Sequence, residues 1–177
     1  MEKQAGSNLR NWLRQVDYVL LDAARSPEIA PAIMQQADAW LPLWNVGEEA
    51  EELLTVSPYL VRWQPRTDFA EWLLQNGWGQ SWGVFLTLRV QTPLEQLRRH
   101  FQSLLLVQVE HEPHHYYFRF YDPRVLRVFL ETCTLEQAQQ FFGPVRAFLC
   151  EGANQAEMIL YELKHTGVEH KALRIET

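Results

Sequence analysis

The chain has 177 residues, of which 47% are hydrophobic and 21% charged, a balance that excludes a disordered protein and allows a full hydrophobic core. A formal net charge of −6 disfavours nucleic-acid binding, which needs a basic surface to displace counterions from phosphates. No apolar run reaches the ~18 residues that cross a bilayer, and the polar N-terminus lacks the apolar stretch of a secretion signal. We therefore expect a cytoplasmic protein that has no nucleic-acid partner and does not insert into membranes.

The first part of the chain alternates short strands with short helices. Apolar runs over Asp17–Asp22 and Pro58–Trp63 predict two buried strands. Between them, Ser26–Pro27 predicts a helix start, because serine caps free N–H groups and proline fits the first helical position. A further helix is predicted with Asp68 as its N-cap, and the Asn76–Gly77 pair predicts its end.

The middle of the chain continues this alternation. Apolar residues at every second position predict a strand over Trp82–Val90. The clearest helix follows, with Thr92 as the expected cap and Pro93 at the first helical position. Leu105–Glu110 and His115–Tyr121 then predict two strands joined as a hairpin.

The last third carries the strongest capping signals. Asp122–Pro123 predicts a helix start, and the Thr134–Gln137 capping box predicts another helix that ends at Gly143–Pro144. The runs Arg146–Glu151 and Glu157–Leu163 predict two final strands.

Strands that alternate with short helices predict an α/β fold, and the hairpin predicts a mixed β-sheet flanked by short helices. No Gly/Ser-rich linker divides the chain, so we expect a single compact domain with a small C-terminal extension. The expected organisation is an N-terminal segment over 1–16, the α/β domain over 17–150 and a short extension over 151–177.

The stretch HEPHH, His111–His115, matches the letters of the zinc-protease motif HExxH. That chemistry needs both histidines one turn apart on a helix, whereas Pro113 disfavours a helix and the flanking residues predict strands. We interpret the stretch as a polar hairpin turn, and we expect no metal site and no cofactor.

The stretch GQSWG, Gly79–Gly83, matches the nucleophile elbow GxSxG, and Asp122 with His165 or His170 follows in the order of a serine hydrolase. An elbow must lie between a strand and a following helix, whereas here a helix precedes and a strand follows. A hydrolase that uses Ser81 therefore stays the alternative hypothesis, and it requires these side chains to lie within hydrogen-bonding distance.

Three blocks occur in order along the chain: SPYLVRW, WLLQNGWGQSWGVFL and FRFYDPRVLRVFL. With the earlier YVLLDAA and the later FFGPVRAFL, they resemble the DUF4123 family of type VI secretion adaptor chaperones over roughly residues 17–150. The resemblance implies a non-enzymatic protein of the bacterial cytoplasm without a cofactor. It also implies two partners: a cognate toxin effector, and the VgrG spike onto which the effector is loaded.

The run YYFRFYDPRVLRVFL places Arg119, Arg124 and Arg127 around one proline. A cation near the start of a helix opposes the helix dipole, so we expect an acidic group to compensate Arg124. That group belongs either to the fold itself or to the effector, and both readings stay open. Trp78 and Trp82 are further candidate partner contacts, because tryptophan is enriched at interfaces. A third hypothesis, a small-molecule site at the Trp-rich loop, requires a concave apolar pocket.

Overall fold

The computed structural model describes residues 7–45, 47–108 and 112–176. In these residues the main sheet is built from β1 (Ser7–Asn8), β2 (Tyr18–Asp22), β3 (Trp40–Pro42), β4 (Pro58–Arg62), β5 (Gly83–Leu88), β8 (Val145–Glu151), β9 (Glu157–Lys164) and β10 (Gly167–Glu176). A separate two-stranded sheet consists of β6 (Leu106–Gln108) and β7 (His115–Tyr117).

The helices lie between these strands along the chain. The α-helices are α1 (Leu9–Trp12), α2 (Ile29–Gln36), α3 (Asp68–Gly77), α4 (Leu94–Leu104), α5 (Pro123–Thr132) and α6 (Leu135–Phe142). Three 3-10 helices complete the set: η1 (Leu13–Gln15), η2 (Ala23–Arg25) and η3 (Glu48–Val56). None of the helices in the described ranges is both long enough and apolar enough to span a membrane.

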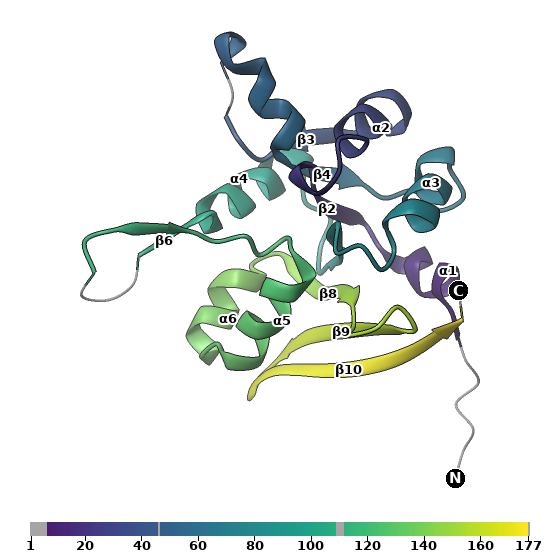
Figure 1. The fold of residues 1–177 in the computed structure, drawn as a ribbon. Helices are drawn as coiled ribbons and strands as arrows, with labels where there is room; N and C mark the ends of the chain where they lie inside the picture. Colours follow the sequence, from purple (N-terminus) through teal and green to yellow (C-terminus); the bar gives the residue numbers. More distant parts are fainter. Residues whose placement is uncertain (1–6, 46, 109–111, 177) are drawn as a thin grey trace.

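The strand order in the main sheet is β1-β10-β9-β8-β5-β2-β4-β3 (Figure 1). Every neighbouring pair is antiparallel except β1 and β10, which are parallel. The predicted α/β fold, a mixed sheet flanked by short helices in a single compact domain, is therefore confirmed.

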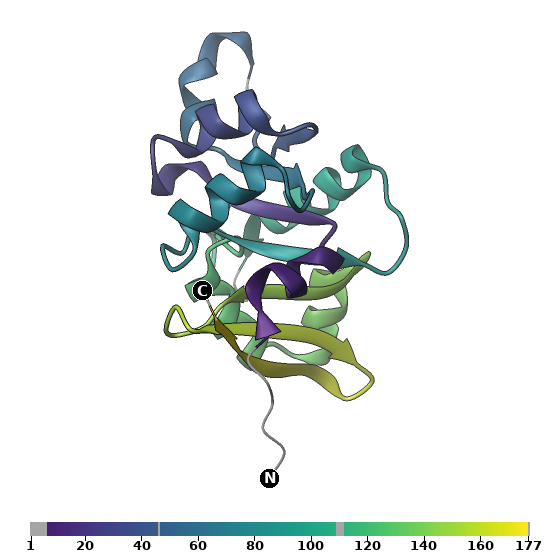
Figure 2. The same cartoon turned by 90° about the vertical axis from the view of Figure 1, so that its right-hand side faces the viewer.

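Hydrophobic layers cover both faces of the sheet. Along β2, Val19 and Leu21 pack with α1, α2 and α3, whereas Tyr18 and Leu20 pack with α4, α5 and α6 (Figure 2). Because β2 is buried on both faces, its sequence is a continuous apolar run rather than an alternating one.

The helix starts in the first half differ from the predicted ones. The α2 helix begins at Ile29, three residues after Ser26, because Ser26 and Pro27 form a turn before it. The cap of α3 is Thr67, whose hydroxyl accepts the Ala70 N–H at 3.2 Å, and the predicted cap, Asp68, is the first helical residue.

Two further predictions at helix ends are wrong. The α4 helix begins at Leu94 after Pro93, and the Thr92 hydroxyl donates to the Val90 carbonyl instead of capping it. Gly77 stays in α3, whereas the positive φ angles occur just beyond, at 84° for Gly79 and 56° for Ser81.

The capping signals in the last third are confirmed. The Asp122 side chain accepts the Arg124 N–H at 2.9 Å, and Pro123 occupies the first position of α5. The reciprocal Thr134–Gln137 box caps α6, which ends at Phe142 and is followed by Gly143 with φ 48°.

The predicted strand over His115–Tyr121 ends early, at Tyr117. Phe120 and Tyr121 are buried, with 0% and 2% of their surface exposed, among residues of α4, α5 and α6. The chain leaves the hairpin after Tyr117 and places these rings in the core, so residues 118–121 are not part of the strand.

The C-terminal residues continue the main sheet. β9 follows β8 as predicted, and β10, which the sequence pattern did not predict, pairs with β9 along eight residue positions. β10 also pairs with β1, where Ser7 lies beside Ile175. The division of the chain at 16/17 and 150/151 stays a prediction, and residues on both sides of each boundary belong to one sheet.

Candidate partner-binding site

The predicted arginines lie at the end of the sheet where β2 and β8 terminate. Both strands are antiparallel to β5, so they run parallel to each other. Their last residues, Asp22 and Glu151, therefore lie at the same end of the sheet as Gly83, the first residue of β5. The N-terminus of α5 begins at this end, directly after Asp122.

Asp22 forms an ion pair with Arg119 inside the fold. The Asp22 side chain is only 1% exposed, whereas the Arg119 side chain is 45% exposed. Asp22 also accepts the Ala24 N–H at 3.1 Å and so caps η2. The hydrogen bond to Asp22 raises the pKa of Arg119, with a smaller opposing effect of burial.

Asp122 forms a second ion pair, with Arg124. It receives the Arg124 Nε at 3.0 Å and Nη2 at 2.6 Å, in addition to the backbone N–H. Burial alone would raise the pKa of Asp122, but the hydrogen bonds and charge of Arg124 outweigh it and lower the pKa. The acidic compensation that Arg124 requires is therefore present within the fold.

Arg127 binds the backbone at the end of β8. Its Nη1 donates to the carbonyl of Glu151 at 2.7 Å and to that of Gly152 at 3.2 Å. The side chain thus ties α5 to the end of β8. Arg124 and Arg127 therefore bind different partners within the fold.

The glycine-rich loop before β5 holds the Glu151 carboxylate through backbone amides. The Ser81 N–H lies 3.2 and 3.1 Å from the two carboxylate oxygens, and the positive φ angles of Gly79 and Ser81 give the concave backbone typical of an anion nest. Burial raises the pKa of Glu151. The interaction uses the amide of Ser81 and not its hydroxyl.

The hydrolase alternative depends on where the histidines lie. Glu151, which binds Ser81, pairs with Met158, whereas His165 lies in the turn beyond the other end of β9. His165 lies seven positions beyond Met158, a distance of about 23 Å along an extended strand. His170 pairs with Tyr161 farther along the sheet, where their rings lie 5.7 Å apart. The register therefore does not bring Ser81 into hydrogen-bonding distance of His165.

The two candidate tryptophans have different environments. Trp82 is 8% exposed and belongs to the core beneath α3, where its ring lies 5.6 Å from that of Trp72. Trp78 is partly exposed, and its Nε1 donates to the Gln155 carbonyl at 2.8 Å. Trp78 is therefore more accessible to a partner than Trp82.

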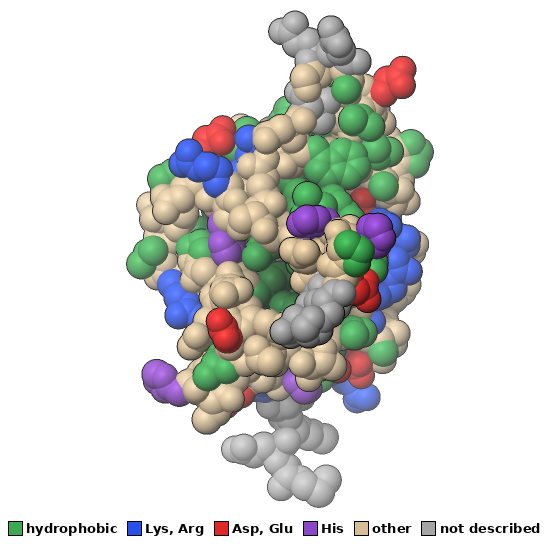
Figure 3. Space-filling view, turned by 90° about the vertical axis from the view of Figure 1, so that its left-hand side faces the viewer, with side chains coloured by type: hydrophobic (Ala, Val, Ile, Leu, Met, Phe, Trp, Pro, Cys, Tyr) green, Lys and Arg blue, Asp and Glu red, His purple; other side chains and the backbone are tan. Residues whose placement is uncertain are grey.

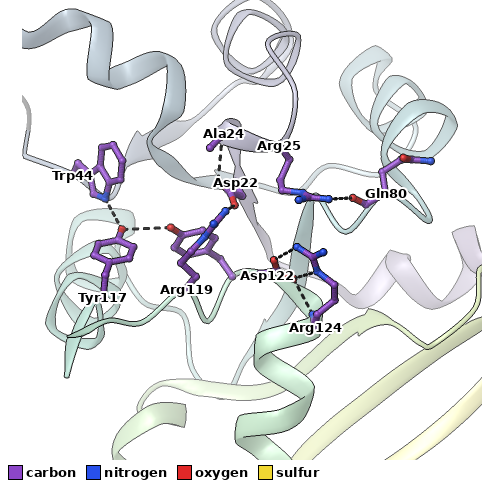
Figure 4. A network of polar contacts seen from close by, with 10 residues as sticks. Asp22, Ala24, Arg25, Trp44, Gln80, Tyr117, Arg119, Asp122 and Arg124 are labelled. Atoms are coloured by element: carbon purple, nitrogen blue, oxygen red, sulfur yellow. Dashed lines mark hydrogen bonds and ion pairs between the residues drawn. The ribbon is translucent and has the colours of Figure 1, made fainter. Parts of the chain in front are cut away.

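The polar contacts around Asp22 and Asp122 extend to several residues that sequence reasoning missed (Figure 4). Arg25, which is exposed, donates from Nη2 to the Gln80 carbonyl at 3.3 Å. Trp44 Nε1 donates to the Tyr117 hydroxyl at 2.5 Å. Asp22 could have been recognised, because a carboxylate that ends a fully apolar strand needs a cation or a cap. No local pattern indicates the other contacts.

Exposed apolar side chains gather on the hairpin and along α5. On the hairpin, the large apolar residues that are exposed are Leu106, Val107, Tyr116 and Tyr117. On α5, Val128 is 66% exposed at a shallow depression of about 640 Å³. The hairpin projects from the body of the molecule, and hydrophobic side chains lie beside it on the face that Figure 3 shows.

The HEPHH stretch lies partly outside the described residues, because His111 is not among them. His115 is the first residue of β7, and the Glu112 carboxylate accepts the Tyr116 hydroxyl. Within the described parts of the chain, no group of three or more His, Cys, Asp or Glu side chains could hold a metal ion.

Comparison with known families gives one match. The family described as "Domain of unknown function (DUF4123)" matches residues 18–140 of the chain. This range includes the strand β2, the hairpin and the whole of α5. Comparisons with curated proteins and with solved structures found no match.

Proposed function

The chain belongs to the DUF4123 family, and on this basis we propose that it is an adaptor that binds a toxin effector in the bacterial cytoplasm. The adaptor helps to load this effector onto the VgrG spike of a type VI secretion system. Its role is to bind proteins rather than to catalyse a reaction, and it needs no cofactor.

The observation that supports this proposal best is the exposed apolar surface of the hairpin. Four large apolar side chains, Leu106, Val107, Tyr116 and Tyr117, are exposed on two short neighbouring strands. Contiguous exposed apolar residues are typical of protein interaction sites, and tyrosine is enriched there. Both strands are within the family match.

Deletion of the protein tests the proposal in a strain that carries the secretion system. Export of the one cognate toxin should be lost, whereas assembly of the secretion tube should continue. The chain and that toxin should also co-purify as a stoichiometric complex when they are expressed together. Normal toxin export in the deletion strain would contradict the adaptor function.

The Ser81→Ala variant separates the adaptor from the hydrolase alternative. The Ser81 backbone amide, which binds Glu151, is kept in this variant, and only the hydroxyl is removed. We expect unchanged folding and unchanged toxin export. Loss of export by a variant that still folds and still binds the toxin would support the hydrolase.

A further inference from the structure

The exposed arginines and the surface of α5 form one continuous region. Arg25, Arg119 and Arg124, here called the arginine cluster, come from three segments of the chain and gather around Asp22 and Asp122 (Figure 4). The depression on α5 is lined by Asp122 and Arg124 at one end and by apolar residues along its length. A partner that binds α5 therefore meets the arginine cluster.

The arginine cluster presents positive charge although the whole chain carries −6. Its two acidic partners are hidden, with 1% and 4% of their side chains exposed, whereas Arg119 and Arg124 are 45% and 53% exposed. The buried carboxylates hold these two guanidinium groups in place, so they are already ordered before a ligand arrives. The side chain of Arg25 donates a hydrogen bond to the backbone carbonyl of Gln80, which carries no formal charge.

The shape of the α5 surface fits a helix. Val125, Val128, Phe129 and Thr132, here called the α5 stripe, follow the spacing i, i+3, i+4, i+7 of a single helix face. From Val125 to Thr132 this stripe is about 10 Å long. A second helix can lay its apolar face along such a stripe.

We propose that the arginine cluster and the α5 stripe bind an amphipathic helix of the partner protein. The apolar face of that helix lies on the α5 stripe, and its acidic side chains bind Arg25 and Arg124. The inference rests on the proposed adaptor function for the partner's identity, which is the effector. Beyond that function, the inference names the surface of this chain that binds the effector and predicts that the bound segment of the effector is acidic.

The first test uses two synthetic helical peptides of about 18 residues, roughly five turns, with the same leucine positions and either glutamate or lysine elsewhere. Binding to the full chain is measured by fluorescence anisotropy at about 50 and 500 mM salt, because screening weakens exposed ion pairs. We expect the acidic peptide to bind at least about tenfold more tightly than the basic one at low salt, and to lose this advantage at high salt.

Variants then locate the surface. Arg25→Glu reverses an exposed charge and Val128→Glu places a charge on the α5 stripe, and neither changes Arg119 or Arg124, the arginines that are hydrogen-bonded to the buried carboxylates. Each should weaken binding of the acidic peptide by about tenfold. Arg62→Glu is the matched control, because Arg62 is exposed at the opposite end of the β2–β4 ladder from Asp22. It should leave binding unchanged.

The outcomes separate this inference from the adaptor function. Equal binding of both peptides, or equal effects of Arg25→Glu and Arg62→Glu, overturns the proposed surface. A single-stranded oligonucleotide that binds more tightly than the acidic peptide overturns it in favour of a phosphate ligand. If the complex with the toxin also survives Arg25→Glu and Val128→Glu, the adaptor function stands and the toxin binds elsewhere.

Discussion

Asp122 has two roles at the same position, because one carboxylate caps a helix and neutralises an arginine. It accepts the backbone N–H of Arg124 and two N–H groups of its side chain. Burial of a charged group is unfavourable, so the arrangement depends on the arginine remaining in place. The same dependence applies to Asp22, whose partner is Arg119.

The Asp122→Asn variant should lose about 1–2 kcal/mol of unfolding free energy at neutral pH, a modest value because solvent screens the exposed Arg124. Asparagine keeps the cap but not the charge. Because folding lowers the pKa of Asp122, its contribution is present at neutral pH and is lost as the pH falls below about 4. Urea unfolding should therefore show the full difference at pH ~7 and a smaller difference at pH ~3. Asp38→Asn, at an exposed position, is the control, and an equal loss at both pH values would contradict the prediction.

The sequence predicted the partner of only one of the three arginines, Arg124, and the reason is physical. The need of Arg124 for a nearby acid follows from the helix dipole, and the structure supplies it two residues away. The partner of Arg119 lies 97 residues away, and Arg127 binds backbone carbonyls at the end of β8. Contacts that depend on the packing of distant segments leave no local pattern. Partner binding by Arg119, Arg124, Arg127, Trp78 and Trp82 stays a prediction.

At the scale of elements, β5 can pair with β2 only because its first residue is glycine. A Cβ atom at Gly83 would lie 2.0 Å from the Leu20 carbonyl oxygen, which belongs to the backbone and cannot rotate away. This position explains the second glycine of the WGQSWG stretch as a requirement of strand pairing.

The Gly83→Ala variant should therefore lose about 3 kcal/mol or more of unfolding free energy, because β5 and β2 must separate to admit the methyl group. Gly47→Ala is the matched control, since a Cβ there meets nothing within 4 Å. Its stability should stay within about 0.5 kcal/mol of the parent chain. Chemical denaturation measures both variants, and a Gly83→Ala variant as stable as Gly47→Ala would refute the clash.

The elements that were predicted well share strong local signals. β2 is apolar from Tyr18 to Leu21, and α5 and α6 begin with capping residues at the expected positions. β10 was missed because most of its residues are polar or exposed, and its pairing with β9 comes from the turn that joins them. The early end of β7 was missed because Phe120 and Tyr121 are buried among residues of α4, α5 and α6, and that packing leaves no local pattern.

At the scale of the whole molecule, the two edges of the main sheet differ in how they limit pairing with another chain. β3 is short and ends in Pro42, which limits further pairing on that side. On the other side, β10 is long, and in the described residues β1 covers it only at Ile175–Glu176. The open part of β10 carries exposed charges at Glu169 and Lys171, which are typical of strands that avoid pairing with other chains.

Removal of these charges should create a new association between chains. The double variant Glu169→Thr with Lys171→Val should form dimers or larger species as concentration rises, measured by light scattering after gel filtration, because its open strand becomes apolar and pairs more readily. The control removes one charge of each sign from helices, with Glu136→Thr and Arg99→Val. An unchanged mass for the β10 variant would count against the protective role of the charges.

The long separation between Asp22 and Arg119 also has a consequence for folding during synthesis. A ribosome releases β2, the middle of the sheet, 97 residues before the arginine that neutralises its last side chain. The loop at Ser81 likewise precedes Glu151 by 70 residues, and β10 emerges after every strand with which it pairs. A buried carboxylate without its partner is unfavourable, so the nascent chain gains little from early closure of its core. We expect the protein to reach its native state only after translation ends, and until then to expose apolar strands that general chaperones recognise.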